Sequence, residues 1–293
     1  MNCRVGINLL LLLSWSIIKA EDLTNDGDGA HPARGQLGKL HEKAEQLIAS
    51  LKVELSQLGA SLTTAATAKT KQTGYPPSCL AAMINTDGIH TVRVAGLEPF
   101  PVACDTRTAG AGWTVIQRRQ DGSENFYRSW AEYRAGFGNL SAEFFMGLEP
   151  LHLMTHAEPY ELYIHLEDFD GETRYAKYDR FVVANESDSY ALSGLGKYTG
   201  DAGDALSYHV GMPFSTYDND KTRNRCALTY VGAWWYNSCQ HSNLNGQYVE
   251  GGSYERKLSG RGICWKSWRG YDYGYKLTQM MIRPRCRAAS TAA

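Results

Sequence analysis

The segment Pro213–Gly251, PFSTYDNDKTRNRCALTYVGAWWYNSCQHSNLNGQYVEG, is the stretch around which the rest of the molecule is organised. It combines alternating acids, two cysteines thirteen positions apart, a Trp-Trp-Tyr run and a polar Asn/Gly loop. Asp218 and Asp220 flank Asn219, and carboxylates that alternate in an irregular loop are typical of a calcium turn. The loop lacks the further acids and closing Glu of an EF-hand, and a solvated turn rich in Asx residues is the alternative interpretation.

Three parts of the sequence resemble one family. STYDND and NRCALTYVGAWWYNSCQHSNLNGQY resemble the distal part of a fibrinogen-related domain, the module of fibrinogen chain ends, ficolins, tachylectins, angiopoietins and tenascins. Gly112–Thr155 resembles the opening half of that domain, and Lys266–Pro284 resembles its last strands. Because these segments follow the family order over roughly residues 74–287, we expect an α+β, fibrinogen C-terminal-like domain. It would have an antiparallel sheet and a loop-rich, calcium-binding C-terminal subdomain.

The resemblance implies a calcium site close to Cys226. The carboxylates of Asp218 and Asp220 and the backbone carbonyls of Thr222 and Asn224 would hold the ion. These positions fall eight, six, four and two residues before Cys226, as in the family. The expected role of calcium is structural, because it would fix the loop that shapes a neighbouring ligand pocket.

The resemblance also places a ligand pocket around the second cysteine of this segment. In fibrinogen-related lectins the preceding peptide bond is cis, which here is Ser238–Cys239, and its N–H groups would point at a ligand oxygen such as an acetyl carbonyl. The expected pocket residues are Ser238, Cys239, Gln240, His241, Tyr236, Tyr248 and Tyr271. For each tyrosine, ordinary core packing is the alternative to a pocket wall.

Two positions depart from the family's lectins. Gln240 stands where those lectins usually have a His, with His241 one place later, and Ser259 stands where ficolins and the fibrinogen gamma subunit have a pocket tyrosine. Calcium binding is therefore implied more fully than recognition of acetylated sugars. Asn243, Asn245 and Gly246 are expected to shape the loop rather than contact ligand.

Met1–Ala20 reads as a secretory signal peptide, with Arg4 in its charged region and Val5–Ile18 as its apolar run. A retained signal anchor is the alternative, although this run is too short for an ordinary membrane span. Residues 21–36 are polar and predict a flexible leader, and residues 288–293 predict a tail. We expect a secreted, extracellular protein without membrane insertion.

Removal of the signal peptide would remove Cys3 and leave six cysteines. An even number in an oxidising compartment favours full pairing, but six cysteines allow fifteen connectivities. The resemblance implies the pairs Cys79–Cys104 and Cys226–Cys239, which leaves Cys264–Cys286 by exclusion.

Residues 37–62 carry a helical pattern, and six of their side chains fit a and d positions of about three heptads: Leu37, Leu40, Ala44, Leu47, Leu51 and Leu58. This pattern favours a coiled coil that assembles a dimer or trimer. A lone amphipathic helix lying on the domain is the alternative. Residues 63–77, Ala/Thr-rich and ending in Gly-Tyr-Pro-Pro, predict a linker to a domain at residues 78–287.

Within that domain, short alternating apolar runs separated by Gly, Asp and Asn turns predict antiparallel strands. These runs are Trp113–Gln117, Tyr160–His165, Tyr175–Tyr178, Arg180–Val183 and Leu277–Ile282. Trp130–Gly136 and Gly147–His156 predict short helices. The C-terminal third is expected to be loop-rich and held by a disulfide, the ion and stacked rings.

Several function classes are disfavoured. The net charge of −1 supplies no electrostatic reason for nucleic acid or an anionic membrane as a partner. His152 and His156 have zinc-binding spacing without the intervening Glu of a metalloprotease, and no Ser stands in a nucleophile elbow, so we expect no enzyme. Asn139 and Asn185 open two glycosylation sequons.

We therefore predict a secreted, calcium-stabilised, lectin-like protein of innate immunity that recognises acetylated carbohydrate or other acetylated groups. The alternatives are a signalling ligand of the angiopoietin kind, which binds a protein receptor, and an extracellular matrix or structural protein. An enlarged apolar patch around the pocket would favour a receptor. A narrow tyrosine-lined cup would favour a small acetylated ligand.

Overall fold

The computed structural model describes residues 42–52, 74–253 and 255–285. The molecule divides into two compact units, Met1–Gln72 and Thr73–Ala293. In the first unit, residues 42–52 form a helix in which Leu47 and Leu51 are 63% and 51% exposed. The predicted signal peptide, leader, tail, remaining heptad positions and most of the linker lie outside the described residues.

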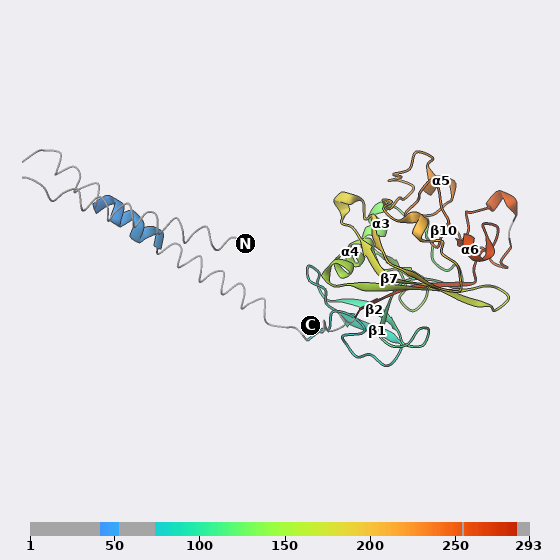
Figure 1. The fold of residues 1–293 in the computed structure, drawn as a ribbon, viewed down its shortest axis with the longest axis horizontal. Helices are drawn as coiled ribbons and strands as arrows, with labels where there is room; N and C mark the ends of the chain where they lie inside the picture. The colour runs from blue at the N-terminus through green and yellow to red at the C-terminus, as the bar shows by residue number, and fades with distance from the viewer. Residues whose placement is uncertain (1–41, 53–73, 254, 286–293) are drawn as a thin grey trace, which may run out of the picture. The chain divides into compact units, whose positions relative to one another are not determined.

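An antiparallel sheet forms the scaffold of the second unit (Figure 1). Its main path is β1-β2-β3-β12-β6-β7-β8, and the short strands β4, β5 and β9 pair at its margins. In sequence order these strands are β1 Gly88–Val92, β2 Phe100–Asp105, β3 Trp113–Arg119, β4 Phe137–Gly138, β5 Phe144–Phe145, β6 Tyr160–Glu167, β7 Thr173–Val183, β8 Leu192–Leu195, β9 Tyr198–Gly200 and β12 Leu277–Pro284. The last strand therefore lies between β3 and β6, in the middle of the sheet.

Two helices cover the core side of this sheet. Successive side chains of a strand alternate between faces, so Leu162, Ile164 and Leu166 of β6 point the same way, and all three are fully buried. Helix α4 (Leu148–Ala157) packs against β7, and α3 (Trp130–Ala135) packs against α4. Figure 1 shows α3, α4 and the C-terminal loops on the same side of the sheet.

The predicted strands and helices are present, with one difference. Tyr175–Tyr178 and Arg180–Val183 belong to a single strand, β7, that continues through Asp179. The backbone N–H of Asp179 donates to the carbonyl of Lys197 at 3.2 Å, and its carboxylate accepts the N–H of Lys197 at 2.7 Å. A polar side chain at the margin of the sheet therefore does not interrupt the strand.

The C-terminal third is loop-rich, as expected. Its regular elements are η3 Ser207–His209, α5 Cys226–Thr229, β10 Ser242–Asn243, η4 Arg256–Leu258, β11 Cys264–Trp265 and α6 Lys266–Arg269. Buried indole rings connect these loops to the rest of the unit by hydrogen bonds. The Nε1 of Trp235 donates to the carbonyl of Tyr190 at 2.8 Å, and that of Trp265 donates to Gly203 at 2.9 Å. No helix within the described ranges is long and apolar enough to cross a membrane.

Candidate functional site

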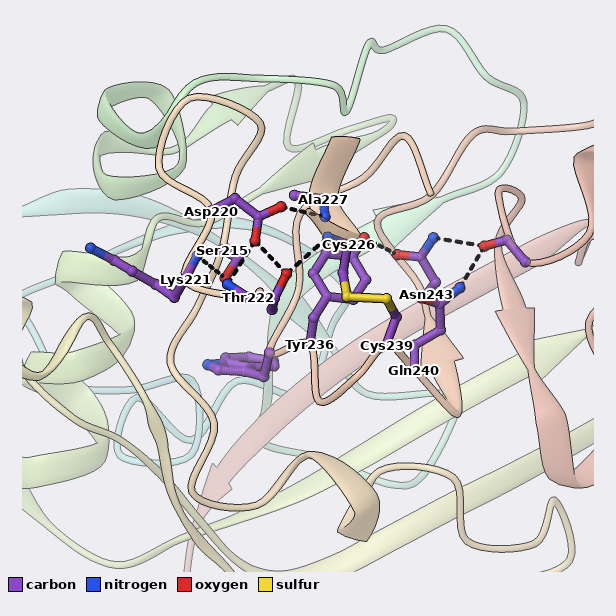
Figure 2. Close-up of a disulfide and its surroundings, with 12 residues drawn as sticks. Ser215, Asp220, Lys221, Thr222, Cys226, Ala227, Tyr236, Cys239, Gln240 and Asn243 are labelled. Atoms are coloured by element: carbon purple, nitrogen blue, oxygen red, sulfur yellow. Dashed lines mark hydrogen bonds between the residues drawn. A yellow bond between two sulfur atoms is a disulfide. The ribbon is translucent and has the colours of Figure 1, made fainter. Parts of the chain in front are cut away.

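The first part of the site is the acidic turn, whose side chains are hydrogen-bonded to the loop that carries Cys226 (Figure 2). Asp220 accepts the N–H of Thr222 at 2.9 Å and its hydroxyl at 2.6 Å through Oδ1. Its Oδ2 accepts the N–H of Ala227 at 2.9 Å, and the Thr222 hydroxyl accepts the N–H of Cys226 at 2.9 Å. The turn is therefore built onto the start of α5.

The second carboxylate of the turn connects it to a different element. Asp218 Oδ1 accepts the N–H of Trp130, the first residue of α3, at 2.9 Å and the hydroxyl of Thr216 at 2.7 Å. Its Oδ2 accepts no hydrogen bond among the described residues. The exposed carboxylate thus retains an oxygen that is free to bind a cation.

These residues fit a calcium site of low charge. No group of three or more His, Cys, Asp or Glu side chains within the described ranges can hold a metal, so two carboxylates would need backbone carbonyls, such as those of Thr222 and Asn224. Hard oxygen donors of this kind suit calcium. Three cationic residues, Lys221, Arg223 and Arg225, alternate with the ligand positions and oppose a divalent ion.

The second part of the site is the disulfide that follows this turn. Cys226 and Cys239 are bonded with Cα atoms 5.5 Å apart, and Cys79 and Cys104 form the other bridge, so both pairs implied by the resemblance are present. The Ser238–Cys239 peptide bond is cis, also as expected. The disulfide joins the acidic turn to the segment that forms the next cavity.

A cavity of about 340 Å³ opens beside Cys239. Its walls come from five separate segments of the sequence: Tyr208, Tyr230, Ser238, Cys239, Gln240, His241, Ser259, Gly260 and Tyr271. Five of the seven predicted pocket residues line it. Tyr208, Tyr230 and Gly260 were not predicted, and no local pattern distinguishes them from other Tyr and Gly residues in the sequence.

A buried histidine holds one wall of the cavity in place through hydrogen bonds. His209 is fully buried, and its Nδ1 donates to the carbonyl of Trp235 at 2.6 Å. Its Nε2 therefore accepts, and it receives the N–H groups of His241 at 3.1 Å and Ser242 at 3.2 Å. Burial lowers the pKa of His209 to about 4, so the ring is neutral at physiological pH.

Two of the predicted pocket tyrosines lie elsewhere. Tyr236 is 1% exposed and its hydroxyl donates to Oδ1 of Asn243 at 2.9 Å, so it is a core residue that orients the loop. Tyr248 lines a different cavity and donates to the carbonyls of Gln120 at 2.9 Å and Lys276 at 3.0 Å. Both assignments as walls of this pocket are wrong, because long-range packing turns these rings away from it.

The asparagines of the loop have the expected shaping role. Asn243 Nδ2 donates to the carbonyls of Tyr230 at 3.3 Å and Gly260 at 3.2 Å, both of which line the cavity. Gln240, at the position of the usual His, donates from Nε2 to the same Gly260 carbonyl at 2.8 Å. Gln240 thus links the Cys239 segment to the Gly260 segment across the cavity (Figure 2 shows Gln240 beside the disulfide).

The predicted Cys264–Cys286 bridge is wrong. Cys264 has a free, fully buried thiol, and burial raises its pKa to about 12. The N–H of Tyr275 donates to Ile263 at 3.4 Å, which places Cys264 beside the start of β12. Cys286 lies outside the described residues.

The two sequons are on the surface. Asn139 is exposed and its side chain accepts the N–H of Ser141 at 2.9 Å. Asn185 is also exposed and begins the short helix η2, Glu186–Asp188. Both side chains are therefore accessible to glycosylation, which stays a prediction.

Comparison with known proteins identifies relatives of this unit. Residues 79–285 match the family of C-terminal globular domains of fibrinogen beta and gamma chains. Fibrinogen C domain-containing protein 1-B of Xenopus laevis is 47% identical over 207 residues, which cover 68% of this chain and 44% of the relative. Human angiopoietin-related protein 6 is 46% identical over 199 residues, covering 67% of this chain and 42% of the relative. The protein thus spans less than half the length of these curated relatives.

Solved structures show the same fold. The fibrinogen-like globe domain of human ANGPTL6 is similar with a TM-score of 0.70 and 43% identity, covering 74% of this chain and 99% of that domain. A lamprey fibrin D-dimer, complexed with the peptide ligand Gly-His-Arg-Pro-amide, is similar with a TM-score of 0.67 and 31% identity, covering 89% of this chain and 94% of the matched fibrin chain.

Proposed function

Because this protein belongs to the family of fibrinogen C-terminal globular domains, which are not enzymes, we propose that it is a secreted, calcium-stabilised binding protein for acetylated ligands. The cavity beside Cys239 is the observation that supports this proposal. It is small, and tyrosine rings from three segments form its walls. An aromatic wall suits the methyl group of an acetyl substituent.

Two residues that line the cavity have backbone N–H groups that are candidate donors to the acetyl carbonyl. The N–H groups of Cys239 and Gln240 donate no hydrogen bond within the part of the chain that the structure describes. A ligand carbonyl that accepts them would satisfy two polar groups that otherwise depend on water. We propose this pair as the site of the acetyl oxygen.

The charge of the cavity disfavours an amine ligand. None of its described lining residues is a carboxylate. A peptide amino terminus would enter as an ammonium group, and burial of a charge without a partner is costly. A neutral acetyl group carries no such cost.

Calcium is proposed to stabilise the turn that ends at Cys226. The two carboxylates Asp218 and Asp220 face three neighbouring cationic residues, so we expect a dissociation constant on the order of 10⁻⁴–10⁻³ M, as in extracellular modules. Calcium at a concentration of about 2 mM, above this range, should raise the melting temperature of the wild type. Asp218→Asn should abolish this increase, whereas Asp201→Asn, outside the turn, should retain it. An equal increase in both variants would contradict the calcium site.

The proposed acetyl site is tested by calorimetric titration. N-acetylglucosamine and N-acetylgalactosamine should release heat on binding, whereas glucose, which lacks the acetyl group, should not. Tyr230→Ala removes a cavity wall and should abolish the heat, while Tyr217→Ala, at an exposed tyrosine outside the cavity, should keep it. No heat from any acetylated sugar would refute the proposal.

A protein receptor is the second candidate partner, favoured by the similarity to angiopoietin-related proteins. An exposed aromatic contact beside the acidic turn offers a surface for it. Tyr217 is 36% exposed and its ring lies 4.8 Å from that of Tyr127. If titration with the acetylated sugars releases no heat while calcium still raises the melting temperature, a protein receptor is favoured over the acetyl site.

We further propose that the helix around residues 42–52 assembles a dimer or trimer. Leu47 and Leu51 lie one helical turn apart on the same side and are both more than half exposed. Linking several weak sites would raise avidity without any new contact. Sedimentation equilibrium of the secreted protein measures the assembly. A monomer, or an unchanged oligomer in the Leu47→Glu/Leu51→Glu variant, would contradict it.

A further inference from the structure

A second cavity, of about 640 Å³, is the one that Tyr248 lines. Its lining residues fall within residues 119–127, at Val231 and within residues 246–250. It shares no lining residue with the cavity beside Cys239. Pockets that hold small ligands or single side chains of a partner have volumes of roughly 300–1,000 Å³, so this cavity is large enough to be a binding site of its own.

A buried carboxylate holds one wall of this cavity in a fixed conformation. The side chain of Glu143 is fully buried, and its Oε1 accepts the backbone N–H groups of Gln120 at 2.7 Å and Asp121 at 3.1 Å. The same oxygen accepts the N–H of Gly122 at 3.0 Å, and Oε2 accepts that of Glu124 at 3.2 Å. Four backbone donors on one carboxylate order the loop before any ligand arrives, which reduces the entropy cost of binding.

The lining carries more negative than positive charge. It contains the carboxylates of Asp121, Glu124 and Glu250 and a single cation, Arg119, which gives a net charge of −2. Glu124 is already paired with Arg128 at 2.5 Å. Asp121 and Glu250 are exposed and form no ion pair among the residues that the structure describes. Two carboxylates are therefore available to a cationic ligand.

The cation of the lining is buried and has its own charge partner. Arg119 and Glu143 are 1% and 0% exposed, and Nε of Arg119 lies 3.6 Å from Oε2 of Glu143, so together they form a neutral pair. Nη1 donates to the carbonyls of Leu244 at 3.3 Å and Gly246 at 2.7 Å. Nε and Nη2 have no hydrogen-bond acceptor within the described ranges. Because an unsatisfied buried donor is costly, a ligand carbonyl that reaches this guanidinium would be stabilised.

Two tyrosines add aromatic faces to the same cavity. Tyr127 and Tyr248 are both half-buried lining residues. The hydroxyl of Tyr248 donates to the carbonyls of Gln120 at 2.9 Å and Lys276 at 3.0 Å, which fixes its ring. The face of an aromatic ring attracts a cation, and most strongly where water is partly excluded. Aromatic faces beside unpaired carboxylates suit the side chain of Arg or Lys.

We propose that this cavity binds an exposed segment of a protein partner that carries Arg or Lys. The basic side chain is directed toward Asp121 and Glu250, and a backbone carbonyl of the segment accepts from Arg119. This inference rests on the second candidate function, a protein partner, and does not depend on the acetyl site. Because both carboxylates are exposed to solvent, we expect roughly a three- to tenfold preference for a charged over a neutral segment at low salt.

The test is calorimetric titration of the full secreted protein with the peptide benzoyl-Gly-Arg-Gly-Arg-Gly-amide. The matched neutral peptide contains citrulline, in which a urea group replaces each guanidinium at nearly the same shape. Neither peptide carries an acetyl group or a free amino terminus. At about 50 mM NaCl the arginine peptide should bind about three- to tenfold more tightly than the citrulline peptide, and about 500 mM NaCl should reduce this ratio.

Matched variants assign the effect to the cavity. Asp121→Asn/Glu250→Gln should bring the affinity ratio close to one. Asp188→Asn/Asp272→Asn removes two charges at exposed acids outside the cavity and should leave the ratio unchanged.

Three results would overturn the inference: equal affinities for the two peptides in the wild type, a ratio unaffected by Asp121→Asn/Glu250→Gln, or displacement of the arginine peptide by N-acetylglucosamine. Displacement would mean that the peptide occupies the cavity beside Cys239 instead. The acetyl site is decided separately, by the heat that the acetylated sugars release in the absence of peptide.

Discussion

The buried imidazole of His209 predicts a specific loss of stability in acid. Its Nε2 accepts the N–H groups of His241 and Ser242, and its Nδ1 donates to Trp235. Protonation would place a second hydrogen on the ring, at Nε2, opposite two N–H donors, in a site without solvent. The folded protein therefore resists protonation, and acid must favour the unfolded state.

The magnitude follows from the two pKa values. The pKa of His209 is about 4 in the fold and about 6.5 in an unfolded polypeptide. Well above pH 6.5 neither state binds the proton, so this group adds no pH dependence. Between about pH 6.5 and pH 4 only the unfolded state binds it, and stability falls as pH falls. The difference of about 2.5 pKa units corresponds to roughly 3 kcal/mol lost by pH 4.

Urea denaturation at several pH values between about 7 and 4 measures this loss. Other groups titrate in the same range, so wild type is compared with His209→Gln, which cannot titrate but can still donate and accept. The free energy of unfolding should fall by about 3 kcal/mol less in the variant than in wild type. His156→Gln, at an exposed histidine, serves as the control and should follow wild type. Parallel pH profiles for wild type and His209→Gln would refute the reasoning.

Three further predictions concern the core and the cysteines. Glu143→Gln should lower the free energy of unfolding by about 3–5 kcal/mol in urea denaturation, because Arg119, 1% exposed, loses its buried charge partner; a loss below about 1 kcal/mol would contradict this. The Cys264 thiol should resist iodoacetamide in the folded protein and react in denaturant, as read by peptide mapping; a disulfide-linked peptide containing it would disprove the free thiol. Replacement of Cys226 and Cys239 together by Ser should cost about 3 kcal/mol, and an unchanged urea midpoint would count against that value.

The disulfides show how far sequence reasoning could lead. Cys79–Cys104 and Cys226–Cys239 join residues 25 and 13 positions apart, and the resemblance located both. Exclusion then assigned Cys264 to Cys286, whereas in the structure the buried Cys264 thiol is free.

The candidate site also has parts that the sequence located and parts that it did not. The acidic turn, the cis bond and the segment from Ser238 to His241 are each contiguous, so they could be identified from the sequence. The tyrosines are not: Tyr230 and Tyr208 line the cavity, whereas Tyr236 is buried in the core. Each is the same residue type in similar local surroundings, and its environment depends on contacts with distant segments.

The strands and the position of the acidic turn could be read from the order of the residues, because they depend on local pattern and near neighbours. The family and the two disulfides followed from the resemblance of these segments to known proteins. Which rings enclose the cavity and which thiol stays free became visible only in the folded molecule. Those properties depend on which remote segments the sheet and the loops bring together, and on the water that their packing excludes.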